Sequence, residues 1–196
     1  MLNSIFIWEV GKLITAKQML SSCQELRLAK GTNTAWALKH FKIIEDTLYT
    51  DEHVLFCFIG VDDYTPVTEH NFNCGYALSN KRIIMAQKKI AGQELRTVDI
   101  NNINNIQFSA GVIVGVVTID TAVQKFNIGL NKVKAEIVSN KLNILLAELK
   151  NNPKAFALDK DKVLAFRELK KLKILLGTGM ITKTEYEEKK KMVLGF

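Results

Sequence analysis

The sequence predicts an α+β fold: a small β-barrel or sandwich of about seven antiparallel strands, closed by a C-terminal helix, with further helices at both ends. Two observations predict it. Between residues 51 and 128 the apolar residues come in short β-branched and aromatic runs that are separated by turn residues, as in strands. On either side they recur at intervals of three and four residues, as in amphipathic helices. Short strands followed by one amphipathic helix suit a small barrel that is plugged at one end.

Two helices are expected before the strands. Thr15 and Gln18 form a capping box at the start of the first helix. We expect this helix to run to about Lys30, where Gly31 can end it. The second helix is expected over 35–48, where large apolar residues recur at helical spacing.

Seven strands are expected next, with Gly, Asn and Ser marking the hairpin turns between them. The expected strands lie near residues 54–60, 71–78, 82–87, 93–98, 106–109, 113–120 and 123–128. Asn131 then caps a helix that has a single apolar stripe. The stripe consists of Ala135, Val138, Leu142, Leu145 and Leu149.

The last part of the chain is expected to be a linker and a helical hairpin. Pro153 stops the preceding helix, and the hairpin turns at Gly177 and Gly179. Thr182 and Glu185 form a second capping box. The predicted organisation is an N-terminal helical segment, a β-domain, a linker and a hairpin, at residues 1–49, 50–149, 150–160 and 161–196.

Composition excludes several classes of protein. With 47% hydrophobic and 24% charged residues, the chain has enough apolar surface to fold, so a disordered or low-complexity protein is excluded. No run approaches the roughly 18 apolar residues that a membrane-spanning helix needs. The apolar start carries Glu9 and lacks a basic leader, and the three cysteines form no CxxC pair. We therefore expect a reduced, cytoplasmic setting.

The β-region carries a family resemblance. The stretch 75–85 contains the turn Ser-Asn-Lys-Arg between two strands, and the motif Ile100-x-x-Ile103 follows before a Gly- and Val-rich hairpin at 111–119. This pattern, over roughly residues 50–149, resembles bacterial pleckstrin-homology-like (PH-like) domains. The resemblance implies a PH-like barrel. No agreed catalytic role belongs to that family, so it implies no active-site residues.

The C-terminal segment resembles a second family. Residues 163–194 combine a leucine-rich helix, a Gly turn, Ile-Thr, and an acidic-aromatic-acidic start to a Lys-rich helix. This signature is similar to the short C-terminal (SHOCT) domain, with Tyr186 where Phe is more usual. Together the two resemblances imply a protein of bacterial or phage origin.

No catalytic motif, cofactor site or metal site is expected. The strongest candidate for a metal site combines His53 and Cys57 with His70 and Cys74. On a hairpin centred near Asp63, His53 is expected opposite Cys74. Residues four apart on a strand are separated by about 13 Å, so these ligands cannot converge on one ion, which needs ligands within roughly 2.3 Å.

One candidate patch could bind an anion. It is made of Lys81, Arg82, Lys88 and Lys89, which bracket one hairpin. The net charge of +7 favours an acidic partner. However, the basic residues are mostly Lys, and not Arg, which binds phosphate through two parallel hydrogen bonds. A solvated hairpin end is the favoured interpretation over a ligand site.

We expect a non-catalytic interaction and assembly protein that binds a protein partner and forms a homo-oligomer. A hairpin of this size cannot bury its apolar residues alone, so these form the candidate partner or assembly surface. The residues are Leu169, Leu172, Leu176, Tyr186 and Val193. One alternative is weak peripheral binding to anionic lipid. A nucleic-acid-binding role is disfavoured, because aromatic residues do not interleave with the terminal lysines.

Overall fold

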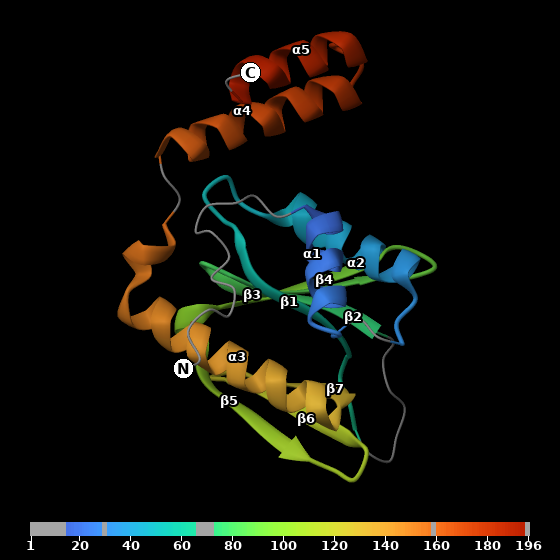
Figure 1. The fold of residues 1–196 in the computed structure, drawn as a ribbon, viewed down its shortest axis with the longest axis vertical. Helices are drawn as coiled ribbons and strands as arrows, with labels where there is room; N and C mark the ends of the chain where they lie inside the picture. Colours follow the sequence, from blue (N-terminus) through green and yellow to red (C-terminus); the bar gives the residue numbers. More distant parts are fainter. Residues whose placement is uncertain (1–14, 29–30, 66–72, 158–159, 195–196) are drawn as a thin grey trace.

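The computed structural model describes residues 15–28, 31–65, 73–157 and 160–194 (Figure 1). All seven predicted strands are present, with helices before and after them, so the predicted α+β fold is confirmed. The helices are α1 (Ala16–Glu25), α2 (Thr34–Thr47), α3 (Lys132–Asn151), α4 (Lys160–Gly177) and α5 (Lys183–Leu194), with short 3-10 turns at Ile100–Asn102 and Pro153–Phe156. The strands are β1 (Val54–Val61), β2 (Asn73–Ser79), β3 (Arg82–Lys88), β4 (Gln93–Asp99), β5 (Ile103–Ala110), β6 (Val114–Thr121) and β7 (Lys125–Asn131).

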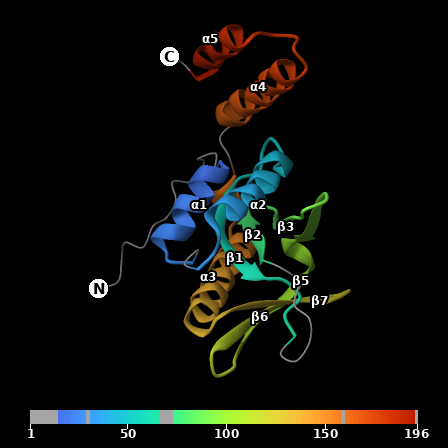
Figure 2. The ribbon, with the colours of Figure 1, turned by 90° about the vertical axis from the view of Figure 1, so that its right-hand side faces the viewer.

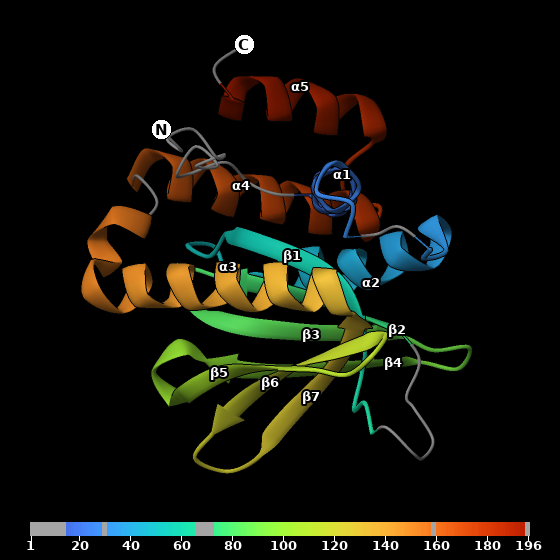
Figure 3. The same ribbon diagram turned by 60° about the horizontal axis from the view of Figure 1, so that its bottom comes forward.

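The strands form one antiparallel sheet in the order β4-β3-β2-β1-β7-β6-β5. Strands β1 and β7 pair over a short length, with Val61 opposite Gly129. The sheet therefore bends there into two halves, β1–β4 and β5–β7, which share one hydrophobic core. Figure 3 shows β5, β6 and β7 crossing below the first half, with α3 alongside.

Helix α3 closes the sandwich. Its predicted apolar stripe is buried throughout, and Asn131 caps it by accepting a hydrogen bond from the Val133 amide at 3.1 Å. Gly115 on β6 allows the close approach, because a Cβ there would lie 2.6 Å from Cβ of Ala135. Helix α3 thus packs mainly against β6 and β5.

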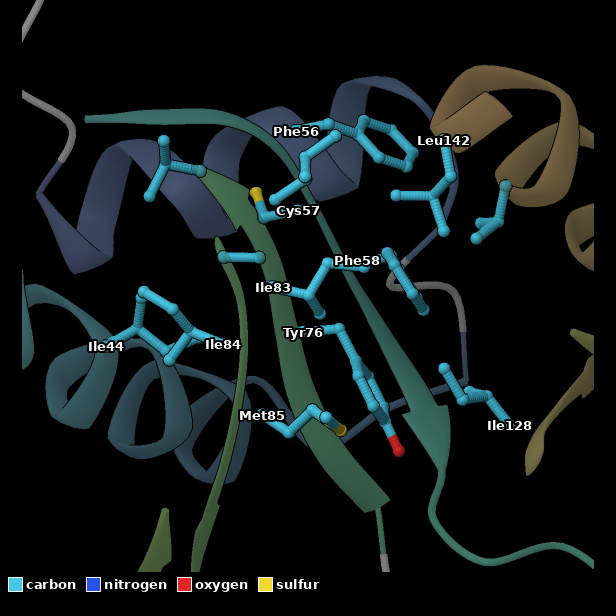
Figure 4. Packing of buried hydrophobic residues seen from close by; sticks show 14 of the residues in the cluster. Ile44, Phe56, Cys57, Phe58, Tyr76, Ile83, Ile84, Met85, Ile128 and Leu142 are labelled. Carbon is cyan, nitrogen blue, oxygen red and sulfur yellow. The ribbon is translucent and has the colours of Figure 1, made fainter. Parts of the chain in front are cut away.

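The inner face of the first half-sheet is aromatic. The rings of Phe58 and Tyr76 stack with centroids 5.0 Å apart, and they point toward Ile128 of the second half (Figure 4). Met85 continues the same row on β3, opposite Tyr76 in the register.

The outer face of the first half-sheet is covered by α1 and α2. Ile84 faces α2, where Ile44 lies beside it (Figure 4), and Cys57 Sγ lies 3.6 Å from Cys23 Sγ of α1. Gly75 lets α2 lie close, since a Cβ there would be 2.9 Å from Cβ of His40. The N-terminal helices are therefore part of the same core as the barrel.

Helix α1 ends at Glu25, about five residues before the predicted end near Lys30. The chain leaves the helix through Arg27, which adopts a left-handed conformation with φ of 56°. Leu28 then donates its amide to the Cys23 carbonyl at 2.7 Å and is fully buried. This is the hydrogen-bond pattern of a glycine-type helix end. Burial of Leu28 offsets the cost of placing Arg27 in a conformation that usually needs glycine.

The α4–α5 hairpin stands apart from the sandwich at the end of the molecule (Figures 1 and 2). The predicted capping box at its second helix is present, with Thr182 Oγ1 accepting from the Glu185 amide at 3.2 Å and Glu185 accepting from the Thr182 amide at 2.7 Å. Lysines of α4 contact the rest of the chain: Lys173 Nζ lies 3.4 Å from carboxylates of Glu45 and Asp46 at the end of α2.

Candidate functional site

The Ser-Asn-Lys-Arg turn, which supplied half of the predicted anion-binding patch, is tied to the segment before β1. Arg82 donates from Nε and Nη2 to the two oxygens of Glu52 at 2.8 and 2.9 Å. Its guanidinium also lies 4.0 Å from the ring centre of Tyr49. The Arg82 side chain is 11% exposed and that of Glu52 is 0% exposed. The Arg82 guanidinium is therefore held inside the protein by a bidentate ion pair.

The Glu52 carboxylate is saturated with donors, because it also accepts from Ser79 Oγ at 2.7 Å and from the Tyr49 amide at 2.9 Å. Next to it, Lys81 pairs with Asp51 at 2.6 Å on the surface. The motif that carries the family resemblance thus joins the β2–β3 turn to the residues before β1.

The other half of the predicted patch lies at the far end of β3. Lys88 ends the strand and Lys89 follows it, where Lys89 pairs with Glu94 at 2.6 Å. A strand of seven residues is roughly 20 Å long. Lys81 and Arg82 therefore cannot reach the same small anion as Lys88 and Lys89.

A pocket of about 590 Å³ opens beside Lys88 and Lys89. One wall comes from the first turns of α2 and the residues before it, and the other from the β3–β4 hairpin. Its lining comprises Thr32, Asn33, Trp36, His40, Asn73, Gln87, Lys88, Lys89, Ile90 and Ala91. This volume lies in the range of pockets that hold a small ligand or a side chain of a partner. The pocket is absent from the sequence-based candidates because its two walls are some fifty residues apart in the chain.

His40 joins the two walls of the pocket. Its Nδ1 accepts a hydrogen bond from the Lys88 amide at 2.8 Å, which requires that nitrogen to be unprotonated. Burial lowers the pKa of His40 from its ordinary value. A neutral imidazole therefore braces the β3–β4 hairpin against α2.

A second buried histidine lies at the start of β1. Both ring nitrogens of His53 are buried without a hydrogen-bond partner among the described residues. Burial lowers the pKa of His53, partly opposed by the charge of Glu52. Like His40, this ring is held neutral by the folded state.

We expect the free energy of unfolding to fall as the pH drops below 6.5, the ordinary pKa of histidine. The unfolded chain binds protons there that the folded chain excludes, so each histidine contributes a slope of up to about 1.4 kcal/mol per pH unit until its lowered pKa is reached. Urea unfolding at about pH 7.5 and at about pH 5.5 measures the slope. His53→Leu should reduce it and leave the stability at the higher pH unchanged or raised. An unchanged slope in that variant would contradict the assignment.

One buried carboxylate lies on the inner side of the sandwich. Asp62 accepts from Tyr76 Oη at 2.8 Å and from the Arg96 guanidinium. Burial raises the pKa of Tyr76, so this phenol stays protonated and donates. Asp62 follows β1 directly and ties that strand to β2 and β4. The arrangement supports the core and offers no free nucleophile or base.

The predicted register around the cysteines is wrong. Cys74 lies opposite Gly60, seven residues along β1 from His53, because the pairing of β1 with β2 is centred near residue 67 and not near Asp63. His70 lies outside the described residues. Within the described ranges, no three His, Cys, Asp or Glu side chains gather into a group that could hold a metal.

The order of the strands, the bend between β1 and β7 and the closing helix α3 are those of a PH-like sandwich. Residues 48–144 match the family model of the bacterial PH domain. No curated protein matches the chain significantly. The match is to a family that is generally non-enzymatic, and it ends before α4 and α5. The resemblance of the C-terminal hairpin to the SHOCT domain stays a prediction from the sequence.

The matched region begins at residue 48, just before the Tyr49–Glu52 segment that receives Arg82, so helices α1 and α2 lie outside it. The wall of the pocket that carries Trp36 and His40 is thus an addition to the PH-like domain. None of the described helices is both long and apolar enough to cross a membrane.

The predicted assembly residues lie on the α4–α5 hairpin and differ in burial. Leu172 is buried, whereas Leu169, Leu176, Tyr186 and Val193 are half-buried. Other large apolar side chains of the hairpin are exposed. They are Leu164, Ile174, Met180 and Met192.

Proposed function

We propose that this protein is a non-catalytic interaction and assembly module, in which the PH-like domain binds a protein partner and the C-terminal hairpin joins copies of the chain. The observation that carries the proposal is the exposed apolar surface of the hairpin. Two helices of 18 and 12 residues pack on each other and leave large apolar side chains in water. Short helices without a covered apolar face are marginal in water, so a further contact would stabilise them.

Several contacts that attach the hairpin to the rest of the chain are polar, which also supports the proposal. Lys173 reaches the carboxylates at the end of α2, and Lys170 donates to the Leu48 carbonyl. Surface ion pairs of this kind contribute little, typically less than about 1 kcal/mol each. The hairpin is therefore free to exchange such contacts for apolar contacts with another copy.

We expect light scattering at micromolar concentration to give a mass above the 22.1 kDa of one chain. Deleting residues 160–196 should return the protein to a monomer, because the exposed apolar residues of the hairpin are removed. The sandwich should keep its circular dichroism spectrum and its thermal transition, since its core contains no residue of α4 or α5.

Two results would contradict this expectation in different ways. A full-length protein that is only monomeric would remove the assembly role. A truncated protein that loses its β-sheet signal would make the hairpin a part of the folding unit rather than a contact arm.

A further inference from the structure

The pocket between α2 and the β3–β4 hairpin has an apolar lip that the fold leaves in water. Ile90, at the tip of the hairpin, is 98% exposed, and Trp36 on the opposite wall is half-buried. Ile90 makes no contribution to the core in this position. A concave site with exposed apolar residues at its edge is the usual form of a site that receives an apolar side chain.

The rim of the same pocket is cationic. Lys39 lies over the ring of Trp36, with Nζ 4.8 Å from the ring centre. Lys88 and Lys89 stand on the other wall, where Lys89 pairs with Glu94. A binding partner should therefore combine a large apolar side chain with carboxylates beside it.

The α4–α5 turn has this chemistry. Met180 projects from the turn and is 73% exposed, and three glutamates, Glu185, Glu187 and Glu188, follow it with one lysine, Lys183, on the first two turns of α5. Two of the other exposed apolar residues of the hairpin have a basic neighbour in the chain. Ile174 lies next to Lys173, and Met192 lies next to Lys191.

We propose that this pocket receives the Met180 turn of a second copy of the chain. The inference rests on the assembly role proposed above and names both surfaces of the contact. The donor turn and the acceptor pocket are different surfaces of one chain. Such contacts are head-to-tail, and they continue from copy to copy unless a ring closes.

The first experiment replaces one exposed residue at a time and measures assembly of the full chain by sedimentation. Ile90→Asp in the acceptor and Met180→Asp in the donor should each weaken self-association by at least roughly tenfold, because a carboxylate would enter an apolar contact. Two controls match them in exposure: Val112→Asp, at 96% on another hairpin tip, and Met192→Asp, at 73% on the same hairpin. Both controls should assemble as the unchanged chain does. All four side chains are exposed, so circular dichroism should report intact folding.

The second experiment mixes the two defective chains. Each retains the surface that the other lacks, so an equimolar mixture should form a complex of two chains and stop there. Equal failure of the mixture and of the separate variants would overturn the proposal.

The third experiment exchanges charges. Lys88→Glu with Lys89→Glu should weaken assembly at least roughly tenfold, and adding Glu187→Lys with Glu188→Lys in the same chain should restore most of it. Lys132→Glu with Lys154→Glu is the control, since it changes the net charge equally at exposed positions on α3 and beyond it.

The outcomes separate this inference from the proposed function. If Met192→Asp disrupts assembly and Ile90→Asp does not, the hairpin joins copies through another surface, and the pocket contact is wrong. If Ile90→Asp instead abolishes binding to anionic vesicles and leaves assembly unchanged, the lip contacts lipid, and the inference is again overturned. A full-length chain that never assembles contradicts both proposals.

Discussion

A chain that lacks residues 1–49 is expected to aggregate or to remain without a cooperative unfolding transition, although it keeps all seven strands. Helices α1 and α2 cover the outer face of the first half-sheet, where β1, β2 and β3 are buried along nearly their whole length. Removing the two helices would expose this large apolar face of the half-sheet to water. The free energy of unfolding of a domain is only about 5–15 kcal/mol. We therefore expect the loss of this buried apolar surface to exceed the stability of the remaining sandwich.

A single substitution tests the same contact within the intact chain. Phe41 on α2 is fully buried, and its ring lies near Gly75 of the sheet. Phe41→Ala should lower the free energy of unfolding by about 3–5 kcal/mol, since a large cavity forms between helix and sheet. Urea unfolding followed by circular dichroism measures this value.

Deletion of residues 160–196 is the matched control, because it removes a comparable length of helix that contributes nothing to the main core. Retention of a normal transition in the chain without residues 1–49 would show that the matched PH-like region folds alone and that α1 and α2 are appendages.

The second large effect is expected at the buried ion pair. Arg82→Ala should destabilise the protein by about 3–5 kcal/mol, because it leaves the Glu52 carboxylate charged, buried and short of two donors. Glu52→Gln should have a similar effect, since it leaves the guanidinium of Arg82 without a counter-charge.

The adjacent residue provides the control. Lys81 also pairs with a carboxylate, that of Asp51, but the two side chains are 37% and 50% exposed. Lys81→Ala should therefore cost no more than about 1 kcal/mol. Equal effects of the two substitutions in a urea titration would contradict the structural role of Arg82. A large Arg82 effect also means that any loss of anion binding in an Arg82 variant must be compared with its loss of folding.

Local patterns predicted most of the elements of the fold. The short apolar runs were sufficient to place the seven strands, and the capping boxes at Thr15 and Thr182 lie at the beginnings of α1 and α5. The stripe from Ala135 to Leu149 was recognised because a helix buries one face at a spacing of three and four residues. These features depend on residues close in the chain.

The predictions that were wrong depended on distant contacts. The end of α1 at Glu25 is decided by burial of Leu28, and the partner of Cys74 by a pairing of β1 with β2 that is centred near residue 67. The residues next to Arg82 in the chain do not indicate whether its side chain is exposed or held in a buried ion pair. Its role became clear from Glu52, thirty residues earlier in the chain.

The sequence by itself determined the types of the elements, their order, and the family resemblance of the β-region, because propensity, capping and periodicity act within a few residues. The tertiary structure alone decided which charges are buried and which surfaces remain free. It placed α2 against the β3–β4 hairpin to form the pocket at Trp36 and Ile90, and it left Met180 in water on the separate hairpin. Burial and the pairing of charges are set by the neighbours that packing brings together, and those neighbours lie far apart in the chain.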